Sequence, residues 1–226
     1  MRHTTDPESG RHAPGLLLHS AGFYDLTLWL LNLGRGRDFH EQFLELADLK
    51  PGETVLDVGC GTGSLALVAK RAVGPEGAVF GVDASPEMLA RAMKKARRAG
   101  LEVVFDQAPA QDLPYRDAEF DAVFSTLMLH HLPHSSRGEC AGEIARVLKP
   151  GGRVLAVDFG APAGRRGGLH RHGGLSLDEM IALFRGADLH VEDSGETGIA
   201  GMQFLLATRP AFRANHPQAG DEITLF

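Results

Sequence analysis

VLDVGCGTG, residues 55–63, joins a short β-branched and apolar run to three closely spaced glycines. The run at 54–58 is typical of a buried strand, and residues 65–73 have the composition and length of a helix. Glycines at this point allow the backbone to bend sharply and to approach a ligand closely. The segment therefore predicts a strand, a glycine turn and a helix, with a ligand beside the turn.

The rest of the chain repeats this alternation of strands and helices. Further strands are expected at 78–82, 102–105, 120–125, 153–159, 189–194 and 202–207, and helices at 39–49, after Ser85 and Pro86, near Ser136, and after the capping box formed by Ser176 and Glu179. The helix after Pro86 is expected to pack with one face that carries Leu89, Ala92, Met93 and Ala96, and a turn at Pro150, Gly151 and Gly152 is expected before the strand at 153–159. This order predicts a three-layer α/β sandwich, with helices on both faces of a mostly parallel seven-stranded sheet. The last two strands are expected to form an antiparallel hairpin. In such folds ligands bind beyond the carboxyl ends of the strands.

Asp83 ends the second expected strand, in GVDAS, about 20 residues beyond the glycine turn. An acidic side chain there can accept hydrogen bonds from both hydroxyls of a ribose. The third glycine position of a GxGxxG dinucleotide pattern is Ser64 in this chain, which argues against NAD. We therefore expect a nucleoside ligand without pyrophosphate. Taken singly, the glycines also fit an ordinary tight turn, and Asp83 also fits a helix-capping carboxylate.

Four motifs, in this order, resemble the class I S-adenosylmethionine-dependent methyltransferases of the ubiquinone/menaquinone biosynthesis type. They are VLDVGCGTG, GVDAS, FDAVFSTLMLHHLP and ARVLKPGGRVLAVDF. The resemblance implies a Rossmann-like class I fold, the cofactor S-adenosyl-L-methionine and transfer of a methyl group to a small molecule. The cofactor contacts that it implies are Asp57, Gly59, Cys60, Gly61 and Gly63 on the methionine and ribose side, Asp83 at the ribose hydroxyls, Ala84 at adenine, and Leu127 behind the sulfonium.

The chain departs from this family after the third expected strand. Relatives usually carry an acidic residue there, in a pattern like GDAxxLP, and its carboxylate accepts a hydrogen bond from the adenine amino group. The aligned stretch in this chain is APAQDLP, which places Pro109 at that position. Asp106 and Asp112 are nearby acidic candidates, and Ala110 and Gln111 offer backbone groups.

Two histidines, His130 and His131, follow the fourth expected strand, where a methyl acceptor would lie. A neutral imidazole can remove a proton from an attacking oxygen, nitrogen or sulfur, because its ordinary pKa is close to cellular pH. The sequence does not distinguish the two histidines, and packing or capping by the HHLP stretch is an alternative. The upstream segment AGFYDLTLWLLNLGRG resembles the start of the same family, which adds Tyr24 as a third candidate beside the acceptor. Its apolar helix is expected either to cover the site as a lid or to dock on the core.

Composition excludes several other classes. The net charge of −6 offers no general attraction to phosphate backbones, so a nucleic-acid substrate is not expected, and the basic run from Arg91 to Arg98 is interpreted as a solvated helix end. Cys60 and Cys140 lack the spacing of metal ligands, so no metal site is expected. No apolar run approaches the length of about 18 residues that a membrane helix needs. The amino terminus lacks the pattern of an export signal, so we expect a cytoplasmic protein.

The predicted organisation is a flexible leader and lid helix at 1–36, a methyltransferase domain at 37–210 and an irregular tail at 211–226. The predicted activity is methyl transfer from S-adenosylmethionine to a small-molecule acceptor, lipophilic or aromatic in view of the apolar helix. Two alternatives stay open at this point: a cofactor-binding module without turnover, and a nicotinamide-dependent oxidoreductase, which the Ser64 substitution disfavours. The sequence does not determine the oligomeric state, and a homodimer stays open.

Overall fold

The computed structural model describes residues 39–160, 174–199 and 201–211. Its elements are α2 (Phe39–Leu46), β1 (Thr54–Val58), α3 (Ser64–Val73), β2 (Ala78–Asp83), α4 (Pro86–Ala99), β3 (Val104–Gln107), β4 (Phe120–Thr126), η1 (Leu129–His131), α5 (His134–Val147), β5 (Leu148–Phe159), α6 (Leu177–Gly186), β6 (His190–Glu196) and β7 (Met202–Thr208). The candidate residue Tyr24, the leader at 1–36 and the tail from residue 212 onward lie outside the described residues.

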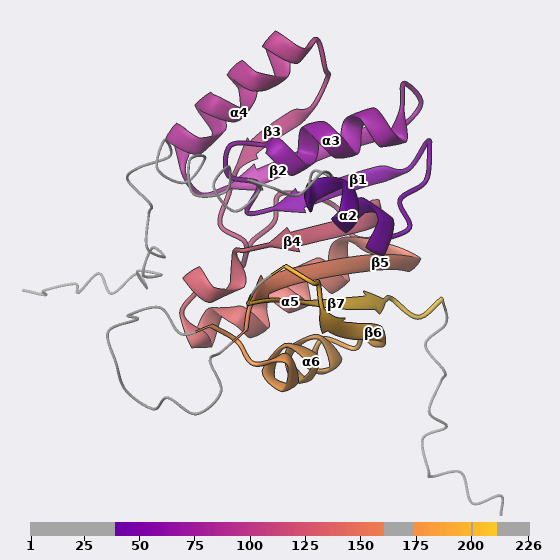
Figure 1. The fold of residues 1–226 in the computed structure, drawn as a ribbon, viewed down its shortest axis with the longest axis vertical. Helices are drawn as coiled ribbons and strands as arrows, with labels where there is room; N and C mark the ends of the chain where they lie inside the picture. The colour runs from indigo at the N-terminus through magenta and orange to yellow at the C-terminus, as the bar shows by residue number, and fades with distance from the viewer. Residues whose placement is uncertain (1–38, 161–173, 200, 212–226) are drawn as a thin grey trace, which may run out of the picture.

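The seven strands form a single sheet in the order β3-β2-β1-β4-β5-β7-β6 (Figure 1). The first five strands of this order pair in parallel, whereas β7 pairs antiparallel with both β5 and β6. This is the predicted mostly parallel sheet with an antiparallel carboxyl-terminal hairpin. Parallel pairing places the carboxyl ends of β1, β2, β4 and β5 at the same edge, which we call the carboxyl edge.

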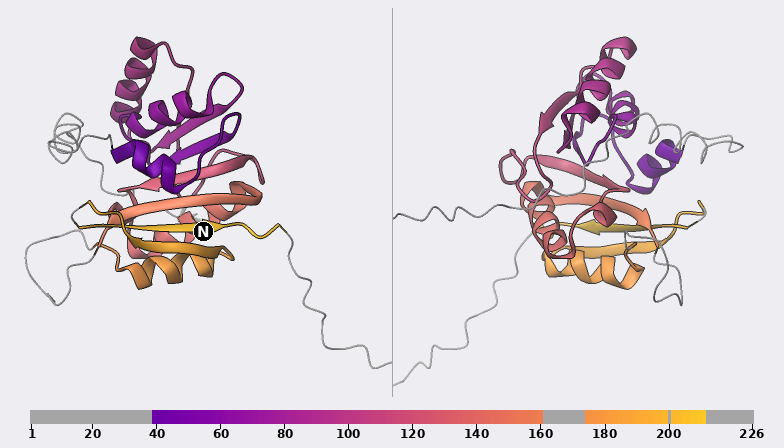
Figure 2. Two further views of the ribbon diagram at one scale, coloured as in Figure 1. Left: turned by 45° about the vertical axis from the view of Figure 1, so that its right-hand side comes forward. Right: turned by 90° about the vertical axis from the view of Figure 1, so that its left-hand side faces the viewer.

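Each face of the sheet carries its own apolar core. Val55 of β1 and Phe124 of β4 pack with α2 and α3, while Leu56 and Val123, the alternate residues of the same strands, pack with α5 and α6. Figure 2 shows α2, α3 and α4 on one side of the sheet and α5 on the other. Strands buried on both faces need apolar residues at every position, which explains the continuous apolar character of β1 and β4. The three predicted layers are confirmed.

Local signals set several element boundaries as predicted. The Ser85 side chain accepts a hydrogen bond from the Met88 N–H, and Pro86 occupies the first turn of α4. The capping box before α6 is also present, since the Ser176 hydroxyl accepts from the Glu179 N–H and the Glu179 carboxylate accepts from the Ser176 N–H.

Other boundaries differ from the sequence prediction. The strand β3 begins two residues later than expected, and α5 begins at His134 rather than near Ser136. The strand β5 already begins at Leu148, because the predicted Pro-Gly-Gly turn lies within the strand, opposite a register shift in β4. Met93 was expected on the packed face of α4 but is exposed, since Met88 and Leu89 fill that face one turn earlier.

Within the described segments, no helix is both long and apolar enough to cross a membrane.

Candidate functional site

The glycine turn at the end of β1 has a backbone that side chains would not permit. Gly59, Gly61 and Gly63 have φ angles of 72°, 53° and 76°, in the left-handed region that favours glycine. A Cβ atom on Gly59 would lie 2.3 Å from Cγ of Met128, and one on Gly63 would lie 2.9 Å from Cβ of Ala92. The three glycines are therefore required by this turn, both for its backbone angles and, at Gly59 and Gly63, for the space around it.

Asp83 connects the end of β2 to the glycine turn. Its Oδ2 accepts a hydrogen bond from the Gly61 N–H at 2.9 Å, and its Oδ1 accepts one from the Ser85 N–H at 2.8 Å. Burial raises the pKa of this carboxyl above its ordinary value, although the two backbone donors oppose the rise. Each oxygen keeps capacity for a further donor. Asp83 is thus hydrogen-bonded both to the glycine turn and to Ser85, the N-cap residue of α4.

Asp57 lies beneath the glycine turn with its carboxylate buried. The residue is 2% exposed, and neither carboxylate oxygen has a hydrogen-bond partner. Burial, and then the negative charge of Asp83, raises the pKa of this carboxyl to about 7, although the nearby Ala66 N–H, which is not placed to form a full hydrogen bond, opposes the rise. Buried polar groups in proteins are nearly always hydrogen-bonded, so an orphaned carboxylate requires an explanation. A cationic ligand group at the turn would supply one.

His130 and Asp158 form a pair at the ends of β4 and β5. The imidazole Nδ1 lies 2.5 Å from Oδ1 of Asp158, and Oδ2 of the same carboxylate accepts the His130 backbone N–H at 3.0 Å. Asp158 is fully buried, whereas the His130 side chain is 12% exposed. An ionised carboxylate only accepts hydrogen bonds, so Nδ1 carries the proton and Nε2 is the basic nitrogen. The pair therefore sets the tautomer that a general base requires.

The residues around His130 form the link between β4 and α5. Leu127 is buried with a φ of 54°, and its N–H donates to the Val157 carbonyl at 2.7 Å. A positive φ at a leucine is uncommon and costs energy, and such strain clusters at functional sites. The rings of His130 and His131 lie 3.9 Å apart, and Phe159 meets His130 edge to face at 5.6 Å. The two candidate histidines are therefore adjacent, and His130 donates to Asp158 together with the Phe159 N–H.

Of the remaining predicted cofactor residues, Ala110 and Gln111 lie in the loop between β3 and β4, and Ala84 directly follows β2. Ala110 and Gln111 are half-buried, whereas Ala84 and Pro109 are exposed. Asp106, one of the acidic candidates for adenine, accepts a hydrogen bond from the Tyr115 hydroxyl at 3.0 Å. At the end of β3, the Gln107 side-chain amide donates to the Ala84 carbonyl at 3.3 Å.

The carboxyl edge thus brings together the glycine turn, Asp57, Asp83, Leu127 and His130. Cys60 belongs to the same turn, is buried, and has a thiol pKa raised well above its ordinary value by burial. Sequence reasoning missed Asp158, although an acidic residue that ends a buried apolar strand next to the histidine-bearing strand was a usable signal. In the part of the chain that the structure describes, no group of three or more His, Cys, Asp or Glu residues is placed to hold a metal ion.

Comparisons with known proteins agree with this geometry. The protein-family model described as "Methyltransferase domain" matches residues 55–152. A demethylmenaquinone methyltransferase of Thermus thermophilus is 41% identical over 140 residues, which cover 62% of this chain and 62% of that protein. A 27-O-demethylrifamycin SV methyltransferase of Amycolatopsis mediterranei is 36% identical over 159 residues, which cover 65% of this chain and 57% of that protein. The chain therefore spans less than two thirds of the length of these curated relatives.

A solved structure, described as a SAM dependent methyltransferase from Aquifex aeolicus, matches 75% of this chain and 89% of that chain, with a TM-score of 0.67 and 26% identity. The family match includes the glycine turn, Asp83 and His130, and the seven-stranded sheet has the antiparallel carboxyl-terminal hairpin that was expected. Residues 55–152 are therefore similar in sequence to methyltransferase domains, and the sheet has the fold of the class I S-adenosylmethionine-dependent methyltransferases.

Proposed function

We propose that the protein binds S-adenosylmethionine at the glycine turn and transfers its methyl group to a small molecule that bears a hydroxyl group. One observation carries the binding step, namely the buried carboxylate of Asp57, which has no hydrogen-bond partner. The ammonium of the methionine moiety is a suitable partner for it, because a buried carboxylate is stabilised by a cation.

The other contacts follow from the arrangement at the carboxyl edge. Asp83 has acceptor capacity left after its two backbone hydrogen bonds and would hold the ribose hydroxyls. Ala84, Ala110 and Gln111 would lie along adenine, and Leu127 would stand behind the sulfonium. Asp106 accepts one hydrogen bond, from the Tyr115 hydroxyl, and keeps acceptor capacity, so it stays a candidate for the acidic contact that Pro109 removes.

S-adenosylmethionine, when bound, supplies a methyl carbon that is activated by positively charged sulfur. The chain's own residues then have to align the acceptor, exclude water and remove a proton. Alignment alone can contribute about 7 to 11 kcal/mol to such a reaction. His130 would accept the acceptor's proton at Nε2, and Asp158 would hold the ring and stabilise the imidazolium that forms.

The choice of a hydroxyl-bearing acceptor rests on this His130–Asp158 pair. An alcohol or phenol loses its proton as it is methylated, and an oriented imidazole is suited to accept it at neutral pH. Relatives named for demethylmenaquinone and for 27-O-demethylrifamycin point to lipophilic acceptors, either aromatic or of the polyketide type. We place the acceptor of this protein in the same chemical range.

The test has a binding arm and a transfer arm. Titration calorimetry should give saturable binding of S-adenosylmethionine, with no binding of NAD. A screen of hydroxylated quinols and macrocyclic alcohols with methyl-labelled cofactor should then identify an acceptor. Absence of cofactor binding would refute the proposal, and binding without transfer to any acceptor would instead favour a cofactor-binding module.

Variants of the pair test the role of the base. His130→Ala and Asp158→Asn should each lower kcat by about 100-fold or more, because general-base catalysis typically contributes that much. Cofactor affinity should stay within about threefold in both variants, since neither residue is assigned to the cofactor. His134→Ala is the matched control, because His134 is exposed at the first turn of α5 and should leave kcat unchanged. Equal activity of His130→Ala and His134→Ala would remove His130 from the mechanism.

A further inference from the structure

Lys95 of α4 is bonded to the glycine turn. Its ammonium donates hydrogen bonds to the Thr62 hydroxyl at 2.7 Å and to the Ser64 hydroxyl at 3.1 Å. These two residues lie on either side of Gly63, and Thr62 is buried. The sequence prediction had assigned Lys95 to a basic run at a solvated helix end. The structure corrects this prediction for Lys95, because its ammonium points back to the turn.

Two further contacts, one from α4 and one from the residue that ends β2, also support the turn. Ala92, one helical turn before Lys95, packs so closely on Gly63 that a Cβ atom there would lie 2.9 Å from that of Ala92. Asp83, just before the helix, accepts the Gly61 N–H. The four residues from Gly61 to Ser64 are thus held from one segment, by a carboxylate, a methyl group and an ammonium.

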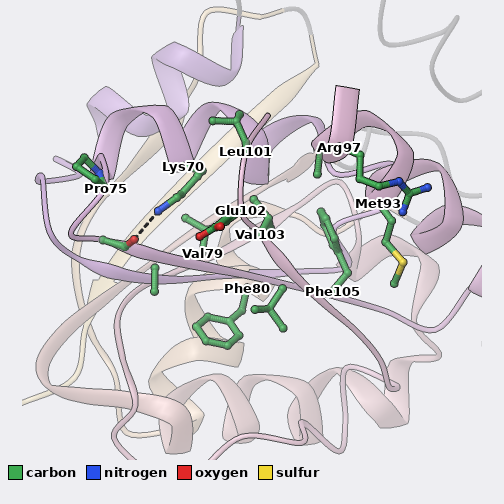
Figure 3. A pocket seen from close by; sticks show the side chains of 14 residues that line it. Lys70, Pro75, Val79, Phe80, Met93, Arg97, Leu101, Glu102, Val103 and Phe105 are labelled. Carbon is green, nitrogen blue, oxygen red and sulfur yellow. Dashed lines mark hydrogen bonds between the residues drawn. The ribbon is translucent and has the colours of Figure 1, made fainter. Parts of the chain in front are cut away.

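A pocket that is open to solvent lies near this region, between α3, α4 and the strands β2 and β3, with a volume of about 480 Å³. Figure 3 shows Met93, Arg97 and Phe105 around it, and Phe105 is also the ring that a Cβ atom on Gly63 would touch, at 3.0 Å. The residues of the glycine turn do not line this pocket, so the contacts of Lys95 and Ala92 with the turn lie outside it.

The placement of the charge also argues against a role in the stability of α3. Gly63 is the N-cap of α3 and Ser64 its first residue, so the ammonium lies at the amino-terminal end of α3. The helix dipole disfavours a cation at that end. A lysine that served only to stabilise α3 would therefore be badly placed, whereas one that holds the turn in a fixed shape is placed where the turn needs support.

We propose that Lys95 is a positioning residue that holds the glycine turn in the conformation that binds the cofactor. This inference rests on the proposed function, because it assigns Lys95 to the same cofactor site. Without the two hydrogen bonds the turn would populate several conformations, and the cofactor would have to select one of them. Apparent affinity falls in proportion to the fraction of protein in the competent conformation.

Lys95→Met tests this proposal, because methionine keeps an unbranched apolar chain and removes the donors. The dissociation constant for S-adenosylhomocysteine, measured by titration calorimetry, should rise about tenfold, which corresponds to about 1.4 kcal/mol. Lys94→Met is the matched control: Lys94 is the exposed neighbour on the same helix, and its replacement should change the constant by less than about twofold. Lys95→Arg, which keeps charged donors, should recover part of the affinity.

Thr62→Val supplies a second test that leaves Lys95 in place. It should also weaken binding, and adding Lys95→Met to it should cost less than the same change in the wild-type protein, because the two residues share a hydrogen bond. A lower melting temperature of Lys95→Met with an unchanged dissociation constant would overturn the proposal and leave Lys95 a structural residue. If Lys95→Met does not fold, unchanged affinity in both Lys95→Arg and Thr62→Val would overturn it. A wild-type protein that binds neither S-adenosylmethionine nor S-adenosylhomocysteine would instead refute the proposed function itself.

Discussion

Asp57→Asn is expected to stabilise the folded protein at neutral and alkaline pH while it weakens cofactor binding. The Asp57 carboxyl is 2% exposed, has no hydrogen-bond partner, and has its pKa raised from an ordinary value of 3.8 to about 7 by burial and by Asp83. Above that pH the folded protein holds a buried and unpartnered negative charge. Asparagine has the same shape and no charge, so it removes this cost.

The sign and the size of the effect follow from proton linkage. The folded-state pKa of Asp57 lies above the unfolded-state value, so the native protein binds the proton more tightly and the contribution of Asp57 to stability falls as pH rises from about 4 to about 7. A difference of about three pKa units corresponds to about 4 kcal/mol once both states are ionised. Between about pH 5 and about pH 8 the expected further loss is about 2.5 kcal/mol.

Urea unfolding of both proteins at several pH values measures this contribution directly. The difference in the free energy of unfolding between Asp57→Asn and the wild type should grow by about 2.5 kcal/mol from pH 5 to pH 8. Comparing two proteins at each pH cancels the titration of other groups. Asp121→Asn is a control of opposite sign. Burial acts to raise the pKa of Asp121, but Lys149 and the Thr54 N–H lower it overall, so this variant should lose stability at pH 8.

Cofactor binding supplies the second half of this prediction. The cationic methionine moiety of S-adenosylmethionine favours ionised Asp57, so its affinity should rise with pH through about pH 7 in the wild type but not in Asp57→Asn. Calorimetry in buffers of different ionisation enthalpy should detect proton release on binding to the wild type alone. A stability difference that does not change with pH, or an asparagine variant that is less stable than the wild type at pH 8, would refute the reasoning.

Three further predictions concern the turn, a surface loop and the ribose contact. Gly59→Ala should lower the free energy of unfolding, measured in urea, by about 2 to 5 kcal/mol, because its Cβ would meet Met128 at a positive φ. Gly52→Ala, at a φ of 85° in open space, should lower it by only about 1 to 2 kcal/mol. Equal losses would show that the contact with Met128 does not matter. Ala118→Gly should raise stability by up to about 1 kcal/mol, because Ala118 is exposed at a φ of 56°, and a loss would mean that chain entropy outweighs the relieved strain. Asp83→Ala should weaken cofactor binding by about 1.5 to 3 kcal/mol in calorimetry, and an unchanged dissociation constant would place Asp83 outside the site.

Much of the fold could be predicted from sequence because its signals are local. The apolar run of β1 and the Ser85–Pro86 start of α4 each depend on a few adjacent residues. The predictions were wrong where burial or strand pairing depends on residues that are close in space but distant in the sequence. Met93 has the spacing of a buried residue, yet Met88 and Leu89 already fill the packed face of α4. The Pro-Gly-Gly sequence before Arg153 suggested a turn because its pairing with β4 cannot be seen along the chain.

The candidate site divides in the same way. The glycines and Asp83 belong to short motifs, and the structure brings them together as the motifs implied. Asp158 and Lys95 act through partners 28 and 31 to 33 residues away, so their contacts cannot be predicted from adjacent residues, although the position of Asp158 near the end of an apolar strand was a signal. The identity of the methyl acceptor is still harder to predict from the sequence, because methyl transfer depends mainly on alignment, which many combinations of side chains can provide.

Departures from ordinary protein stability rules gather at the carboxyl edge. In the part of the chain that the structure describes, Asp48, Ala118, Leu127 and Asp188 are the non-glycine residues with positive φ, and Leu127 alone among them is buried. The other three lie in exposed turns, where small movements of the backbone can relieve strain at little energetic cost. Leu127 lies at the end of β4, the neighbour of the strand that bears Asp57, whose buried carboxylate lacks a partner. Proteins retain such costs mainly where function requires them. The strained backbone of Leu127 and the buried carboxylate of Asp57 therefore both support the assignment of cofactor and acceptor to that edge, and the support from Leu127 does not depend on the glycine motif.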